Sequence, residues 1–124
     1  MTFKSELCEV SKLVRILETE QYFLVNRNLY QIQVIDQERS NVLHKISTYS
    51  ERRYRWLAKA GYSPSESGMC DWFIAIDEPS AQDAWFDMQR LLVKAKVLNL
   101  ANVLLTNRLA EAKQKIAEGM LVAG

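Results

Sequence analysis

Between Ser80 and Met120 the chain carries its longest uninterrupted helical pattern. Mostly apolar residues there recur at alternating steps of four and three positions, the spacing of the seam of a coiled-coil-like helix. No proline or glycine breaks the pattern between Pro79 and Gly119. A segment of this kind needs other helices packed against it, so we expect an all-α fold. The seam comprises Leu91, Ala95, Leu98, Asn102, Leu105, Leu109, Ala112 and Ile116.

Two amphipathic segments come before this one. The first repeats its apolar residues on the same rhythm and predicts a helix over about residues 3–25. The second begins at Asn28, which with Gln31 resembles a capping box, and it predicts a helix over 28–60. Gly61 then stands where the left-handed residue that follows a helix is expected.

The stretch 62–79 is the only loop-like one, and its short apolar block favours a turn or two of helix covering the open end of a bundle. The last helix is predicted over 80–118, with Ser80 as its N-cap and Asp83 as the capping partner. We therefore expect one domain over residues 1–124. Its fold would be an antiparallel three-helix coiled-coil-like bundle with a long C-terminal helix.

The predicted last helix is uneven along its length. Between Trp85 and Leu105 a second apolar row accompanies the seam, which predicts that this half packs against two neighbours. Beyond Leu105 only the seam remains, so this end either completes the bundle or offers a helix face to a partner. The second row comprises Phe86, Val93, Val97, Leu100 and Leu104.

Composition argues against several functional classes. The net charge is +1 and 25% of residues are charged, which indicates neither a nucleic-acid nor a membrane-surface partner. No apolar run approaches the roughly 20 residues that a membrane-spanning helix needs. Cys8 and Cys70 match no metal-binding spacing and are interpreted as free thiols of a reducing compartment. With no apolar secretory segment at the start, we expect a cytoplasmic protein.

Catalytic and metal sites are not indicated either. His44 is the only histidine, and the chain has no phosphate-binding or nucleophile motif, so we expect no enzyme, cofactor or metal. Arg52, Arg53 and Arg55 can contact phosphate, but a solvated helix face is the better interpretation. Arg53 also falls on a helix seam, as Arg39 does, where the stem can pack while the guanidinium reaches the edge.

Asn99 and Asn102 are the polar pair that the seam singles out. Asn102 lies on the seam and Asn99 about one turn before it, so both can point toward the core side of the helix. A buried asparagine at such a position fixes helix register at a cost in stability. The alternative is that the two amides shape a partner-binding face.

The residues around this pair resemble a known family. The segment from Leu98 to Leu105 is similar to the asparagine signature L-N-x-x-N-G-x-L-L of the FlgN-type flagellar export chaperones, with Val103 in place of the glycine. The stretch 35–43 is similar to the family's second-helix pattern, and Gly61 matches a glycine that often closes that helix. The resemblance covers roughly residues 10–120.

This resemblance implies a cytoplasmic chaperone without catalytic activity. Such proteins hold hook-associated proteins 1 and 3 unassembled and deliver them to the flagellar type III export apparatus. In the family the C-terminal helix recognises the client, which implies binding by the last helix here. The client-binding residues expected on this basis are Asn99, Asn102, Leu105, Leu109, Ala112, Ile116 and Met120.

Two other functions remain open from the sequence. A long heptad seam can also self-associate, which would make the chain an oligomeric coiled-coil adaptor with no client. A helical protein associated with nucleic acid would use Lys113 and Lys115 together with the three arginines near residue 53. The function favoured by the resemblance needs neither nucleic acid nor insertion into a membrane.

Overall fold

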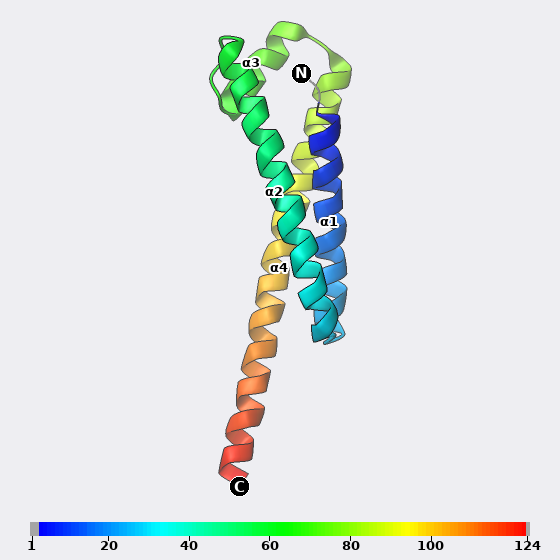
Figure 1. Ribbon diagram of the computed structural model, residues 1–124, viewed down its shortest axis with the longest axis vertical. Coiled ribbons are helices and arrows are strands. Elements are labelled where there is room, and N and C mark those ends of the chain that lie inside the picture. Colours follow the sequence, from blue (N-terminus) through cyan, green and yellow to red (C-terminus); the bar gives the residue numbers. More distant parts are fainter. Residues whose placement is uncertain (1–2, 124) are drawn as a thin grey trace.

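The structure is a computed structural model that describes residues 3–123, with side chains through Met120; residues 1, 2 and 124, at the ends of the predicted domain, lie outside it. The described residues fold into helices and contain no strand, so the predicted all-α class with a long C-terminal helix is confirmed (Figure 1). The helices are α1 (Lys4–Val25), α2 (Leu29–Lys59), α3 (Glu66–Ile76) and α4 (Pro79–Ala123).

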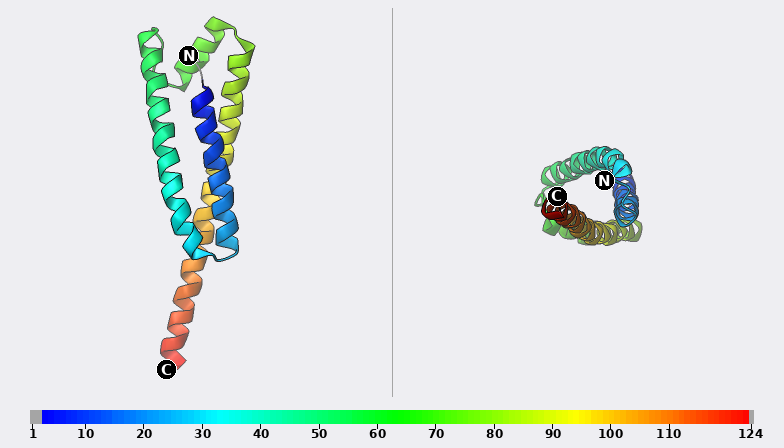
Figure 2. Two further views of the ribbon diagram at one scale, coloured as in Figure 1. Left: turned by 45° about the vertical axis from the view of Figure 1, so that its right-hand side comes forward. Right: turned by 90° about the horizontal axis from the view of Figure 1, so that it is seen from below.

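Helix α1 is the central member of the three long helices. It packs along α2 on one side and along α4 on the other, and these are the two extensive interfaces of the fold. The chain direction reverses from α1 to α2 and again into α4, as Figure 1 shows. Seen from below in Figure 2, the long helices follow a curve with α1 in the middle rather than a closed triangle.

Both ends of α2 have the predicted capping residues. The side chain of Asn28 accepts a hydrogen bond from the backbone N–H of Gln31 at 3.5 Å. At the other end Gly61 has a φ of +90°, and the N–H of Tyr62 donates to the Leu57 carbonyl at 2.9 Å. Because a side chain is strained at positive φ, glycine is the residue that suits this position.

The predicted start of α4 is wrong by one residue. The helix begins at Pro79, so Ser80 lies inside it and is not the cap. Proline suits the first helical position because its φ is already helical and the N–H it lacks would have no partner there. The first backbone bond joins Gln82 N–H to the Glu78 carbonyl at 3.1 Å.

Helix α3 lies within the stretch that the sequence marked as loop-like. Ser65 is its N-cap, with Oγ accepting from the N–H of Gly68 at 3.1 Å. Gly68 is buried against the preceding turn, and a Cβ built on it would lie 1.7 Å from the carbonyl oxygen of Ser63. Only glycine therefore allows the turn and the first residues of α3 to pack this closely.

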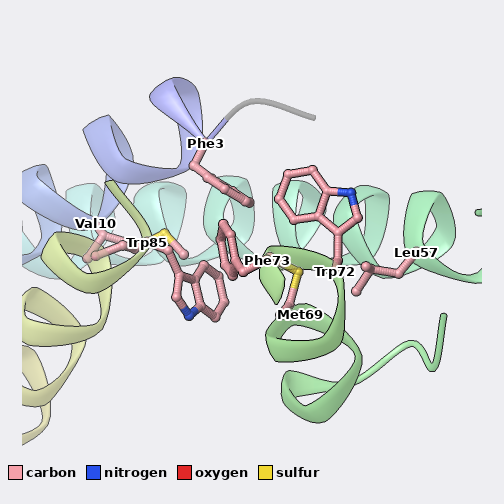
Figure 3. Packing of buried hydrophobic residues seen from close by; sticks show 8 residues of the cluster. Phe3, Val10, Leu57, Met69, Trp72, Phe73 and Trp85 are labelled. Atoms are coloured by element: carbon pink, nitrogen blue, oxygen red, sulfur yellow. The ribbon is translucent and has the colours of Figure 1, made fainter. Parts of the chain in front are cut away.

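The apolar residues of α3 cover one end of the long helices, as the sequence suggested. An aromatic cluster joins α3 to the starts of α1 and α4, with ring centroids 5.0 to 6.1 Å apart (Figure 3). Aromatic pairs at such distances each contribute about 0.5–1.5 kcal/mol beyond the burial of their area. The cluster consists of Phe3, Trp72, Phe73 and Trp85, with Leu57 and Met69 packed beside it.

A second core cluster lies further along α1, where that helix supplies most of the buried residues. Val42 of α2 packs on it from one side and Ala95 of α4 from the other. The seam of α4 is therefore a real packing seam in this half of the helix. Its α1 residues are Leu13, Val14 and Leu17.

Arg53 differs from its predicted position at the edge of the bundle. Its side chain is buried, and its Nε and Nη2 donate to the two carboxylate oxygens of Glu6 at 3.0 and 3.1 Å. Its guanidinium also lies over the Trp85 ring, 4.8 Å from the centroid. Burial opposes the charge of Arg53, but the hydrogen bonds and charge of Glu6 outweigh it and raise the pKa of the guanidinium. Arg53 therefore cannot contact phosphate in this conformation.

Candidate binding surface

Asn102 lies at the last point where the seam of α4 is buried. Its side chain is 2% exposed, and Nδ2 donates to the Leu17 carbonyl at 3.0 Å and to Glu20 Oε1 at 2.8 Å. Glu20 is itself buried, and its other oxygen accepts from Arg39 Nη1 at 2.5 Å. Arg39 in turn donates to Asp36 at 2.8 Å. One polar network thus joins α1, α2 and α4 at this level.

The position of Asn102 favours its register-fixing role. An amide that reaches a specific carbonyl and a specific carboxylate on α1 satisfies both only at one alignment of the two helices. Asn102 therefore belongs to the α1–α4 interface and not to the exposed face of α4.

Asn99 lies in different surroundings although it is one turn away. Its side chain is exposed and borders two adjoining clefts between α2 and α4, of about 220 and 260 Å³. The floor of the first cleft is formed by Leu13 and Leu17 of α1, and Leu43 and Leu92 are among its walls. The two asparagines are therefore neighbours in the chain that face different environments.

Asn107 of α4 still lines a cleft together with Ile32 of α2, and past this level α4 leaves the other helices behind. Figures 1 and 2 show its C-terminal part extending past the turn between α1 and α2. Ile116 and Met120 are 64% and 71% exposed, whereas Leu105, Leu109 and Ala112 are half-buried. The seam residues along this last part of α4 are half-buried as far as Ala112 and exposed beyond it. We call them the distal stripe, which comprises Leu105, Leu109, Ala112, Ile116 and Met120.

The second apolar row of α4 is not buried, which corrects the sequence prediction of two neighbours. Val97 is 64% exposed and Leu100 is 62% exposed, and the other members exceed half exposure. At 3.6 residues per turn the row lies on the side of α4 opposite the residues that pack on α1. We call it the outward row, and it comprises Phe86, Val93, Val97, Leu100 and Leu104.

The buried carboxylates at the helix interfaces were missed by the sequence reasoning. Glu6 and Glu20 both lie on the buried face of α1, at helical spacing from its apolar residues. That spacing was a usable signal, because a charged residue at a core-facing position needs a partner. Their partners Arg53 and Arg39 were both noted on the seam of the second helix.

The remaining surface carries no metal-binding cluster among the described residues. No group of three or more His, Cys, Asp or Glu there is arranged to hold a metal ion. None of the described helices is long and apolar enough to cross a membrane. Cys8 and Cys70 are both exposed and unpaired by a disulfide, as expected.

Comparison with known proteins agrees with the resemblance seen in the asparagine segment. The sequence profile of the family described as FlgN protein matches residues 2–123, which is nearly the whole chain. No curated protein and no solved structure matched. The coverage of the profile and the all-helical fold with its long last helix show that the chain belongs to the FlgN family of flagellar export chaperones.

Proposed function

We propose that the protein binds hook-associated proteins 1 and 3 in the cytoplasm, prevents their premature assembly and delivers them to the flagellar export apparatus. Family membership supports the chaperone class. The observation that supports the client surface is the distal stripe, where the seam that packs on α1 continues onto the part of α4 that extends past the turn between α1 and α2 and ends in exposed apolar side chains, Ile116 and Met120.

The client would bind as an amphipathic helix laid along this stripe. Up to Ala95 and Asn102 the same seam already packs against a helix, α1. A client helix placed beyond the end of α1 would therefore continue an existing helix–helix interface rather than create a new kind of contact. Covering the client's apolar face in this way would shield it from aggregation and self-assembly, and the contact would remain reversible.

The role of the asparagines is narrower than the sequence suggested. Because Asn102 already bonds to α1, its proposed contribution is to hold the register of α4 and so the direction of the projecting segment. Asn99 remains a proposed contact for a client that also enters the clefts beside α2.

Paired aspartate substitutions test the client surface. The variant Leu109→Asp/Ile116→Asp is expected to lose binding to purified hook-associated proteins 1 and 3, measured by pull-down and titration calorimetry. Its circular dichroism should remain that of the wild type, because both residues come after Asn102, the last buried residue of the seam. Unchanged client binding would overturn the proposal, and lost helicity would show that the stripe is part of the core.

The matched control places the same charges on the opposite side of the same segment. Ala110 and Gln114 are both exposed, and the helical repeat puts them on the side of α4 away from the stripe. The variant Ala110→Asp/Gln114→Asp should therefore bind both clients as the wild type does. A loss of binding in this variant as well would indicate a charge effect and not a specific face.

An oligomeric adaptor is the second candidate, because an exposed seam can pair with another copy of itself. Native mass spectrometry over a concentration series separates the two functions. A stable homo-oligomer that is disrupted by Leu109→Asp/Ile116→Asp would support the adaptor, whereas a monomer leaves the distal stripe available to a client.

A further inference from the structure

The outward row is a coiled-coil seam without a partner. Its members advance by steps of seven, four, three and four from Phe86 to Leu104, and each is more than half exposed. The row extends over about 27 Å of helix, which matches a partner helix of roughly 18 residues. Apolar surface of this length, organised in one line, is typical of an interaction site.

After Asp87, which adjoins the first member Phe86, the charges beside the row are all basic. Between Asp87 and Glu111 helix α4 carries four basic residues and no acidic one. Lys96 lies on one flank of the row, and Arg90, Lys94 and Arg108 lie on the other. Lys94 has Glu18 of α1 at 3.6 Å and Arg90 pairs with Asp87, while all four side chains remain exposed.

We infer that the outward row binds an amphipathic helix of another protein whose apolar stripe is flanked by carboxylates. Acidic side chains on both edges of such a helix would face the basic flanks while its apolar residues cover the row. This surface lies on the opposite side of α4 from the seam that continues into the distal stripe. It would therefore allow a second protein to bind while a client is held.

A second copy of this chain fits the same surface less well. Two outward rows packed together would bring the basic flanks of both helices into one interface, with no carboxylate between Asp87 and Glu111 to offset them. Like charges placed together in an interface oppose association.

An anionic membrane surface is also a poorer match. Helices that lie in a membrane interface present a broad apolar face. The outward row is a single line with polar or charged residues on its flanks, such as Gln89 and Lys96 on one side. A line of this width fits a facing helix.

Synthetic helical peptides provide the probe. One peptide of three heptads has leucine at its seam positions and glutamate on both flanks, and the other replaces every glutamate with lysine. Fluorescence anisotropy with the full-length protein should show the acidic peptide binding at least about tenfold more tightly than the basic one. Added salt should weaken the acidic peptide's binding. Equal affinities for the two peptides would overturn the inference.

Two double variants on opposite faces assign the site. Val97→Asp/Leu104→Asp should reduce acidic-peptide affinity at least about tenfold while hook-associated proteins still bind. Leu109→Asp/Ile116→Asp adds the same charges at the same spacing, and its affinity for the acidic peptide should equal that of the wild type. If only Leu109→Asp/Ile116→Asp loses binding of the acidic peptide, the outward row is not the peptide's site. Peptide binding reports on the outward row, and binding of hook-associated proteins reports on the distal stripe. Either proposal can therefore fail while the other stands.

Charge reversal tests the flanks directly. Lys96→Glu/Arg108→Glu leaves two basic and two acidic residues on the flanks, so it should abolish the preference for the acidic peptide, and an unchanged preference would contradict the role of the flanks. Sedimentation of the protein alone tests whether the outward row binds a second copy of this chain. A dimer that Val97→Asp/Leu104→Asp disrupts would overturn the inference in favour of self-association. Binding to phosphatidylserine vesicles without binding to the acidic peptide would overturn it in favour of a membrane.

Discussion

Arg53 of α2 and Glu6 of α1 form a buried bidentate ion pair that joins the two helices beside the aromatic cluster. Ser50 donates a further hydrogen bond to the same carboxylate at 3.1 Å. A buried pair of this kind contributes little net stability compared with well-packed apolar residues, yet removing one partner leaves an uncompensated charge in the interior. Removing one partner should therefore lower the stability of the fold by more than the intact pair adds to it.

We predict that Glu6→Gln lowers the free energy of unfolding by about 3 kcal/mol, because Arg53 would keep its charge without a buried counter-ion. Urea unfolding followed by circular dichroism measures the change. Glu66→Gln is the control, since Glu66 also faces Arg53, at 3.8 Å, but its side chain is 59% exposed. The control should lose less than about 1 kcal/mol. Equal losses in the two variants would show that burial is not what makes the Glu6 contact costly to break.

Gly68→Ala should destabilise the fold by about 1–3 kcal/mol, because the added methyl would meet the backbone carbonyl of Ser63 and not a movable side chain. Gly119 is the matched position, since a Cβ there meets nothing within 4 Å. Gly119→Ala removes a glycine from a helix and should raise or leave unchanged the stability of the protein. The melting temperatures of both variants check this prediction. An unchanged melting temperature in Gly68→Ala would mean that the backbone turn at Ser63 moves to make room for the methyl group.

The sequence was sufficient for the helices because each one repeats its buried residues at helical spacing. Val10, Val14 and Leu17 lie on the predicted rhythm and are buried. The ends of α2 were predictable too, because Asn28 and Gly61 act through local backbone geometry. The start of α4 was missed by one residue, because Pro79 serves as the first helical residue and not as a boundary marker.

The number of neighbours around a helix was not predictable from its apolarity. The outward row has the spacing of a packed seam, and nothing in the pattern distinguishes packing within this chain from packing on another protein. The distal stripe was recognised because the outward row ends near Leu104 while the seam continues. Its role in binding a client remains a prediction.

The polar pairs could be located in part. Arg39 and Arg53 were placed on the seam of the second helix, but their carboxylate partners lie 19 and 47 positions away in the chain. Pairing over such separations depends on how the helices align, which the sequence pattern does not specify. Asn102 was identified as a candidate for register, and only its bonds to α1 favour that role over the binding role.

Substitution of the two asparagines should affect different properties, stability for Asn102 and client binding for Asn99. Asn102→Ala removes two hydrogen bonds and leaves Glu20 Oε1 buried without its donor, so we expect a loss of about 1–3 kcal/mol in urea unfolding. Asn99→Ala should change stability by less than about 0.5 kcal/mol, because the side chain is exposed. If Asn99 contacts the client, this substitution weakens binding to hook-associated proteins while the unfolding curve stays the same.

The opposite pattern would contradict the assignment. A stable Asn102→Ala variant with weakened client binding would place Asn102 on the client face and require α4 to turn or move away from α1. Hydrogen exchange of the α1 amides around Leu17 distinguishes these outcomes. If Asn102 fixes the register, its replacement should speed exchange in that part of α1, because the local opening free energy falls with the lost contacts. Asn99→Ala should leave the same amides unchanged, since Asn99 makes no hydrogen bond to α1 in the described structure.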